Sequence, residues 1–101
     1  MRDSQIVYTI KPIPITFDPA KNAANKRKHR ISLARAEDFD FAAAIYTVDD
    51  REDYGEIRYR ALSFLDARLY SLVFVLDGET IRAISLRKAT RYEEKEYQAS
   101  R

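Results

Sequence analysis

The sequence predicts an α+β fold, in which a pair of helices and a C-terminal helix stand apart from an antiparallel sheet of three to four strands. Two observations support this class. Helix-start signals occur near both ends of the chain, and segments of strand composition follow one another between residues 44 and 86. The length of 101 residues suits one domain with a single modest core. One face of such a sheet packs on helices, and the other can face water and carry a site.

The first residues predict two short extended segments. Residues 6–10 have the composition of a strand, but Pro12 and Pro14 interrupt any ladder there. Proline cannot donate to a ladder, so this segment is an edge strand or an arm. Residues 15–17 are then expected to form a short strand.

Two helices are predicted next, and they are expected to form a hairpin. Asp18-Pro19 begins the first, because aspartate caps free N–H groups and proline suits the first helical position. This helix runs to about His29. Ser32 caps the second helix, which runs to about residue 41 and whose apolar residues recur at helical spacing: Leu33, Ala36 and Phe39.

The remainder of the chain predicts strands and a last helix. Strands are expected at four places: residues 44–48, 57–64, 69–76 and 80–86. Asp77-Gly78 joins the last two strands as a two-residue hairpin, because glycine tolerates the positive φ of a tight turn. Thr90 and Glu93 have the spacing of a capping box that opens the final helix.

Composition excludes several classes of site. The chain has no cysteine and one histidine, so it has neither a disulfide framework nor a Cys/His zinc site. The acidic residues 49–53 lack the spacing of a metal-binding loop. No apolar run approaches the roughly 20 residues that span a bilayer, and the first residues lack a signal-peptide core, so the cytoplasm is the expected location.

Charge is arranged in blocks, although the net charge is only +2. Residues 21–35 are basic, residues 37–56 are mainly acidic, and residues 57–92 are basic again. Such blocks are usually solvated faces. They also permit a basic functional face that binds nucleic acid.

Arginines recur in two strand-like segments, residues 55–60 and 81–90, and His29 lies in the basic run of residues 26–30. Neighbouring strands that present guanidinium groups suit phosphate. RNA cleavage without a metal needs a base, an acid and positive charge for the developing phosphorane. Histidine suits the proton transfers because its pKa lies near neutrality. The pattern therefore predicts a small sheet that holds RNA and is equipped to cut it.

Three segments, in order over residues 15–98, resemble the motifs of the BrnT toxin family. They are Phe17-Asp18-Pro19-Ala20-Lys21 with Asn25 and Arg27-Lys28-His29, then Gly55-Glu56 with Arg58-Tyr59, then Ile81-Arg82 with Ile84-Ser85 and Arg87-Lys88-Ala89-Thr90-Arg91, followed by Glu94 and Tyr97. The chain departs from the family pattern at Arg30, where the family usually has glycine. It also lacks the glycine-containing turn that the family usually has near residues 63–68.

The resemblance implies a bacterial type II toxin of the RelE-like superfamily, a ribonuclease that uses no cofactor. Because the chain lacks cysteine, has one histidine and shows no carboxylate loop, its cleavage is expected to need no metal. It implies neutralisation by a cognate BrnA-like antitoxin, in a complex that binds its own operator DNA through the antitoxin. Because the family generally starts near Ile15, residues 1–14 are expected to be an extension to a single RelE-like domain of residues 15–101.

The resemblance and the chemistry together give the candidate site residues. The expected catalytic residues are His29, Arg58, Arg82, Ser85 and Arg87. The expected RNA-binding residues are Lys26, Lys28, Arg60, Arg91 and Tyr97. Among the catalytic residues, Arg82 is expected to stabilise charge in the transition state, because its planar fork matches phosphate.

Several of these residues also have a structural interpretation. His29 suits a helix C-cap, Arg58 and Arg82 suit cross-strand salt bridges to Glu56 or Glu79, and Tyr97 suits a core position. The alternatives to a ribonuclease are a non-catalytic RNA- or DNA-binding module and an inactive subunit that only binds antitoxin. Convergence of His29, Arg58 and Arg82 on one cleft discriminates between them.

Overall fold

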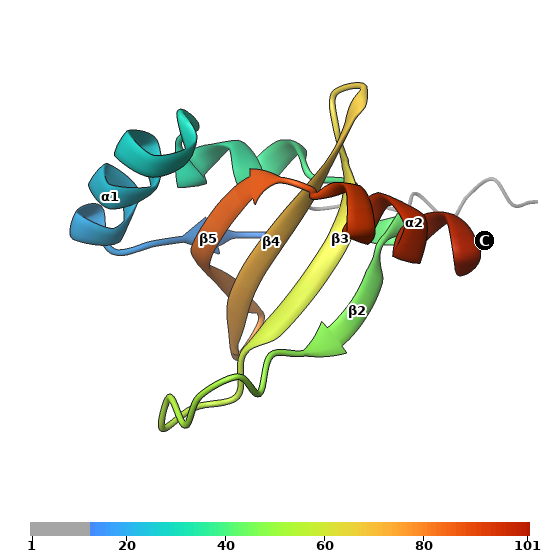
Figure 1. Ribbon diagram of the computed structural model, residues 1–101. Coiled ribbons are helices and arrows are strands. Elements are labelled where there is room, and N and C mark those ends of the chain that lie inside the picture. Colours follow the sequence, from blue (N-terminus) through green and yellow to red (C-terminus); the bar gives the residue numbers. More distant parts are fainter. Residues whose placement is uncertain (1–12) are drawn as a thin grey trace, which may run out of the picture.

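The structure is a computed structural model that describes residues 13–101. Its elements follow the order β1, α1, η2, η3, β2, β3, β4, β5 and α2, where η denotes a 3-10 helix (Figure 1). The predicted α+β class is confirmed. Residues 6–10, for which a strand was expected, lie outside the described residues.

The strands form one five-stranded mixed sheet in the order β1-β5-β4-β3-β2. Four strands are antiparallel: β2 (Ile45–Val48), β3 (Tyr59–Leu65), β4 (Arg68–Asp77) and β5 (Thr80–Lys88). The fifth, β1 (Ile15–Thr16), pairs in parallel with β5. The expected antiparallel sheet of three to four strands is therefore too small. Two residues carry too little pattern to mark a sheet member, and β1 belongs to the sheet only through its pairing with Ile81 and Arg82.

Helix α1 (Pro19–His29) begins and ends where the sequence predicts, and it lies beside β5 at one edge of the sheet (Figure 1). Asn25 fixes this position from the buried side of the helix, where it is 4% exposed. Its side-chain amide donates to the carbonyl of Leu86, and its Oδ1 accepts from the N–H of Leu86. The side chain thus gives the N–H and carbonyl of Leu86 the hydrogen-bond partners that a neighbouring strand would supply, at a point where β1 has already ended.

The predicted second helix is a 3-10 helix and not an α-helix, so the expected hairpin of two α-helices is wrong. Ser32 caps a 3-10 helix, η2 (Leu33–Asp38), and a second one, η3 (Phe41–Ala43), follows. Between them the N–H of Asp40 donates to the carbonyl of Phe64, and the hydroxyl of Ser63 donates to the carbonyl of Asp40. These bonds to β3 hold the backbone where an α-helix would have continued, so tertiary contacts override the helical spacing.

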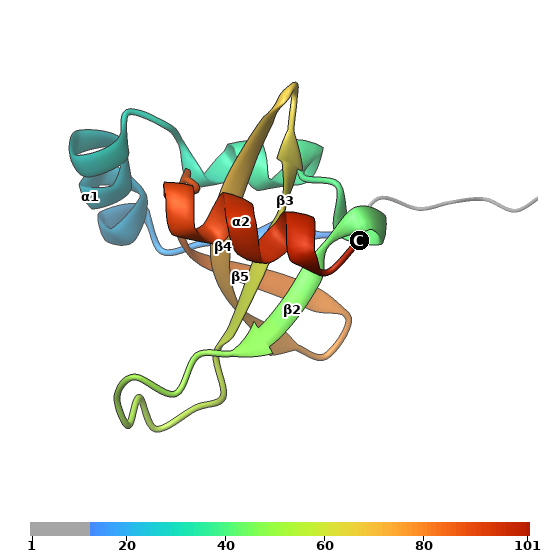
Figure 2. The ribbon, with the colours of Figure 1, turned by 45° about the vertical axis from the view of Figure 1, so that its right-hand side comes forward.

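The two faces of the sheet are covered differently (Figure 2). The main core lies between one face and the η2 segment, and its buried members include Leu33, Leu72 and Leu86. On the opposite face, α2 (Arg91–Ala99) crosses the strands and packs on a smaller cluster. Only part of that second face is covered by α2, which leaves the rest for polar side chains.

Local signals at the turns are confirmed with small shifts. The capping box of Thr90 and Glu93 is present at the start of α2. The last hairpin turns at Gly78-Glu79, one residue later than predicted, with a φ of 62° at Gly78. Strand β3 begins after Arg58, not at residue 57, so Arg58 ends a loop instead of lying in mid-strand. In residues 13–101, no helix is both long and apolar enough to cross a membrane.

Candidate functional site

A β-bulge brings the polar residues of β5 onto one face of the sheet. Strict alternation along β5 would place Arg82 and Leu86 on the same face. In β5, however, Ser85 pairs with Val73 and Ala83 pairs with Phe74, so Ile84 is an extra residue. The bulge turns Ser85 and Arg87 to the α2 side and leaves Leu86 in the core.

The carboxylate of Glu93 holds two of the predicted arginines on this face. Its oxygens accept from Arg60 at 3.1 Å and from both terminal nitrogens of Arg87 at 2.8 and 3.0 Å. Arg60 also donates to Glu96 at 2.8 Å. Glu93 is 5% exposed, and its Oε1 also accepts from the N–H of Thr90. The capping box of α2 therefore anchors strands β3 and β5 as well.

The pKa of Glu93 reflects these contacts. Burial opposes ionisation, but hydrogen bonds from Arg87 and from the Thr90 N–H, together with the charges of Arg87 and Arg60, lower the pKa of the carboxyl from 4.5 to about 2. Glu93 is thus ionised throughout the physiological range, and it fixes the two guanidinium groups in place.

A second cluster surrounds Glu56, and we call it the Glu56 cluster. Arg58 and Arg82 both donate to Glu56, at 3.3 and 2.7 Å, and Arg82 also donates to Asp77 at 3.0 Å. The guanidinium of Arg58 lies over the ring of Tyr54, 4.0 Å from its centroid. The salt-bridge alternative for Arg58 and Arg82 is thus present, with Glu56 as the partner.

His29 is the last residue of α1 and lies near Arg87 and Ser85 of β5. The C-cap of the helix is Arg30, so the C-cap interpretation of His29 is wrong. It lines a cavity of about 450 Å³ with Arg87 and a smaller cavity of about 160 Å³ with Ser85. Burial, the charge of Arg87 and the charge of Lys28 lower the pKa of the imidazole below 6.5. The histidine is therefore neutral at pH 7, which is the form that accepts a proton.

The predicted catalytic residues fall into two groups. Arg87 lines the His29 cavity and also a cavity of about 360 Å³ with Arg60, Ser85 and Glu93. Arg82 is five residues before Arg87, which corresponds to roughly 16 Å along a strand. The two cavities of His29 described above include neither Arg58 nor Arg82. His29 therefore converges with Ser85 and Arg87, and not with the Glu56 cluster.

The predicted RNA-binding residues are also divided. Lys26 and Lys28 are exposed in the last turn of α1, and Arg91 is exposed in the first turn of α2. Tyr97 is only 3% exposed, and its hydroxyl donates to the carbonyl of Ala43 at 2.7 Å. Its ring lies in the smaller core cluster, as the structural interpretation of this residue expects.

Glu93 is the residue that sequence reasoning missed. The capping-box spacing identifies it as a helix cap, but no local signal connects it with Arg60 or Arg87, because those contacts depend on the packing of α2 over the sheet. Within residues 13–101, no group of three or more His, Asp or Glu side chains is arranged to hold a metal ion.

Comparison with known proteins agrees with the sequence motifs. The profile of a family described as the ribonuclease toxin BrnT of type II toxin–antitoxin systems matches residues 17–93. No curated protein matched the chain. The matched range contains α1, the whole sheet except β1, and the arginines that contact Glu56 and Glu93. The chain therefore belongs to the BrnT family of ribonuclease toxins of type II toxin–antitoxin systems.

Proposed function

We propose that this toxin is an endoribonuclease that cleaves RNA without a metal, and that His29, Ser85 and Arg87 act on the scissile phosphate. The observation that carries the proposal is the position of Arg87. It lines the cavity of the neutral His29 and the cavity on the sheet face. A base and a phosphate-binding cation thus lie side by side at one end of the site.

In this reaction His29 accepts the proton of a ribose 2′-hydroxyl, whose oxygen attacks the adjacent phosphorus. The bond to the 5′-oxygen breaks, the leaving oxygen takes a proton from solvent water, and protonated His29 returns its proton to solvent. The products are a 2′,3′-cyclic phosphate and a 5′-hydroxyl. Arg87 uses three hydrogen bonds, two to Glu93 and one to the Lys88 carbonyl. A guanidinium has five N–H donors, so two remain for the phosphorane oxygens. Ser85 is proposed to donate to the same phosphate.

Arg58 and Arg82 are proposed to bind the RNA away from the scissile bond. Each makes two hydrogen bonds to carboxylates. Their remaining N–H groups are available for a backbone phosphate. Arg60, Lys26 and Lys28 are proposed to make further phosphate contacts of this kind.

The proposed partner is a BrnA-like antitoxin whose complex with the toxin binds operator DNA through the antitoxin. Membership of a type II toxin family supports an antitoxin partner. The basic residues that would contact RNA are natural targets for a protein that blocks the site, because an acidic surface would compete with phosphate for them.

Kinetic comparison of Arg87→Lys and Arg82→Lys tests the division of roles. Both variants keep the positive charge but lose the planar fork. Arg87→Lys should lower kcat by about 10²- to 10³-fold, as loss of a transition-state donor does. Arg82→Lys should mainly raise KM. The proposal is wrong if Arg82→Lys gives the larger loss in kcat, with both variants folded by circular dichroism.

A non-catalytic nucleic-acid-binding module is the second candidate, and two observations favour it. The cavities of His29 include neither Arg58 nor Arg82, so the three residues do not converge on one cleft, which is the outcome expected of this candidate. All four arginines of the two clusters already contact carboxylates, so this part of the sheet face is less positive than the sequence indicates. This candidate predicts RNA binding with no cleavage by the wild-type protein, and it predicts no effect of Arg87→Lys on RNA integrity.

A further inference from the structure

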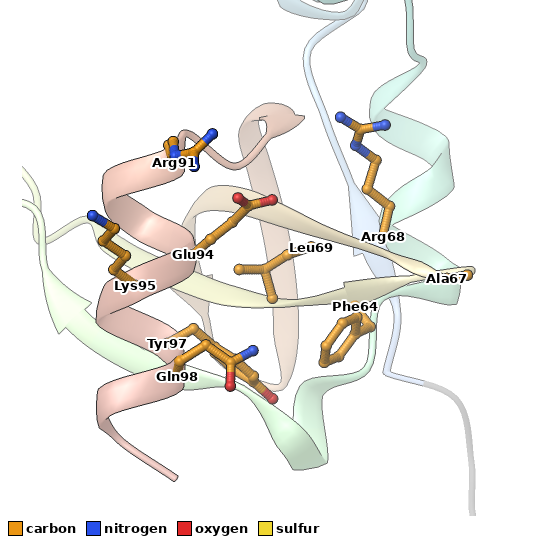
Figure 3. Close-up of a pocket in the computed structure, with 9 residues that line it drawn as sticks. All are labelled: Phe64, Ala67, Arg68, Leu69, Arg91, Glu94, Lys95, Tyr97 and Gln98. Carbon is orange, nitrogen blue, oxygen red and sulfur yellow. The ribbon is translucent and has the colours of Figure 1, made fainter.

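A cavity of about 690 Å³ lies away from His29 and from the arginines that contact Glu56 and Glu93. It is a groove between α2 and the β3–β4 hairpin, and we call it the α2 groove (Figure 3). Phe64 and Leu69 form its apolar floor, and Tyr97 packs against Phe64 edge to face, with ring centroids 5.5 Å apart. Phe64 is 37% exposed, so part of an aromatic ring faces the groove.

The charges of the α2 groove differ from those of the sheet face. Arg91 on α2 and Arg68 on the hairpin stand on opposite sides of it (Figure 3), and Lys95 adds a third cation on the helix. In residues 13–101, none of these three cations forms a salt bridge. The one carboxylate, Glu94, extends from α2 toward the floor beside Leu69. An anionic ligand with an aromatic or apolar part complements this lining.

The α2 groove and the cavity of His29 reach the same end of β4 and β5 from opposite faces of the sheet. In the sheet, Tyr70 pairs with Lys88, and both residues line the His29 cavity. The next residues on each strand meet as well, since the N–H of Ala89 donates to the carbonyl of Leu69, which lines the α2 groove. Because successive strand residues face opposite sides of the sheet, a polymer bound at His29 and Arg87 would cross the end of the sheet at Lys88 and Ala89 to enter the groove at Arg91.

We propose that the α2 groove binds one nucleotide of single-stranded RNA next to the cleavage position. This inference rests on the proposed ribonuclease function. The base packs on Phe64, and Arg68 and Arg91 contact its flanking phosphates, which is the combination of stacking and positive charge that single strands require. Glu94 accepts a hydrogen bond from the exocyclic amine of the base, which favours cytosine over uracil, because uracil presents a carbonyl oxygen at that position.

Binding measurements separate this inference from the cleavage chemistry. The probe is a labelled single-stranded RNA with 2′-O-methyl groups throughout, which lacks the attacking hydroxyl. Arg68→Ala should weaken its binding and reduce the slope of log K against log salt by about 0.7. Phe64→Leu, which keeps an apolar side chain, should weaken binding by about fivefold or more through lost stacking. The matched control is Arg27→Ala, which removes the same charge from an exposed position of α1 outside the groove.

Glu94→Gln tests base recognition. The wild-type protein should bind oligocytidine more tightly than oligouridine. The variant should lose that preference, while its overall affinity rises because a negative charge has been removed. An unchanged preference contradicts the role given to Glu94.

Two outcomes overturn this inference while the proposed ribonuclease function stands, and a third outcome overturns both. If the wild-type protein binds and cleaves RNA but the Arg68 and Phe64 variants behave like Arg27→Ala, the groove is not a nucleotide site, and the ribonuclease function stands. The same holds if these variants bind RNA normally but lose the antitoxin in co-purification, since the groove is then a protein-docking surface. A wild-type protein that neither binds nor cleaves single-stranded RNA overturns both.

Discussion

His29 is the single histidine of the chain, and its environment is the most direct observable at the scale of one residue. Burial, the charge of Arg87 and the charge of Lys28 hold its pKa below 6.5. Loss of the Arg87 charge should therefore raise the pKa in Arg87→Gln. NMR titration of the one imidazole measures this directly. Arg82→Gln removes the same charge at the Glu56 cluster and should leave the His29 pKa unchanged. Equal shifts in both variants would contradict the placement of His29 beside Arg87.

Two residues adopt a left-handed backbone conformation where the family pattern has glycine. In the family, one of these positions is usually a glycine, and the other lies in a turn that usually contains one. Arg30 ends α1 with a φ of 61°, and Asp66 lies in the β3–β4 turn with a φ of 57°. A residue with a Cβ is strained in this conformation, whereas glycine is not. The departures from the family pattern therefore mark strained backbone and leave the turns themselves in place.

Arg30→Gly should stabilise the protein by about 1 kcal/mol, because the helix C-cap then adopts its left-handed conformation without strain. The matched control is Arg27→Gly, which removes the same charge inside α1 and should destabilise by about 1 kcal/mol. Chemical denaturation of the two variants and the wild type measures both effects. If Arg30→Gly destabilises the protein as Arg27→Gly does, the backbone at Arg30 is not strained in the folded protein.

Sequence reasoning identified the individual residues of the candidate site better than their grouping. The types and positions of His29, Ser85 and Arg87 follow from motifs and from chemistry. Their separation from Arg82 does not, because it depends on the bulge at Ile84 and on the position of α1 beside β5. The pairing of arginines with Glu93 is equally invisible in a sequence, since it is formed by packing of a helix on a sheet.

At the scale of elements, Glu93 connects α2 with β3 and β5, and this connection predicts a pH dependence of stability. Its pKa is about 2 in the folded protein and near 4.5 when the chain is unfolded. A carboxyl with a lowered pKa stabilises the fold above its unfolded pKa, and this contribution is lost as pH falls through the range between the two values. The free energy of unfolding should therefore decline below a pH of about 4.5.

Glu93→Gln should cost about 1–3 kcal/mol at pH 7, because Arg60 and Arg87 lose a charged acceptor. It should also flatten the decline of stability in acid. Urea unfolding at several pH values compares this variant with Glu94→Gln, which neutralises an exposed carboxyl in the same helical turn. Identical pH profiles for the two variants would show that Glu93 does not anchor α2.

Elements with local signals were predictable, and elements made by tertiary contacts were not. Asp18-Pro19 and the Thr90–Glu93 box place both α-helices correctly, because caps act within one turn. The short strand expected at residues 15–17 is present as β1, but its parallel pairing with β5 has no signature in the segment itself. The 3-10 character of η2 and η3 is likewise set by bonds to β3.

At the scale of the whole molecule, the two faces of the sheet have separate tasks. One face carries the main core, and the other carries α2, the arginine clusters and the α2 groove. The net charge of +2 understates the local contrast. The arginines of the sheet form salt bridges with carboxylates. At the α2 groove, Arg68, Arg91 and Lys95 form no salt bridge within residues 13–101. Binding of RNA should therefore depend strongly on salt through the groove.

The most direct test of the account is the chemistry of the RNA ends that the purified toxin produces in excess chelator. Cleavage through His29 and Arg87 should continue without divalent metal, and mass spectrometry should find 2′,3′-cyclic phosphate and 5′-hydroxyl ends. His29→Ala, purified in the same way, serves as the control for contaminating nuclease and should yield few of these ends. Cleavage that stops in chelator, or that leaves 5′-phosphate ends, would contradict a metal-independent attack by the ribose hydroxyl.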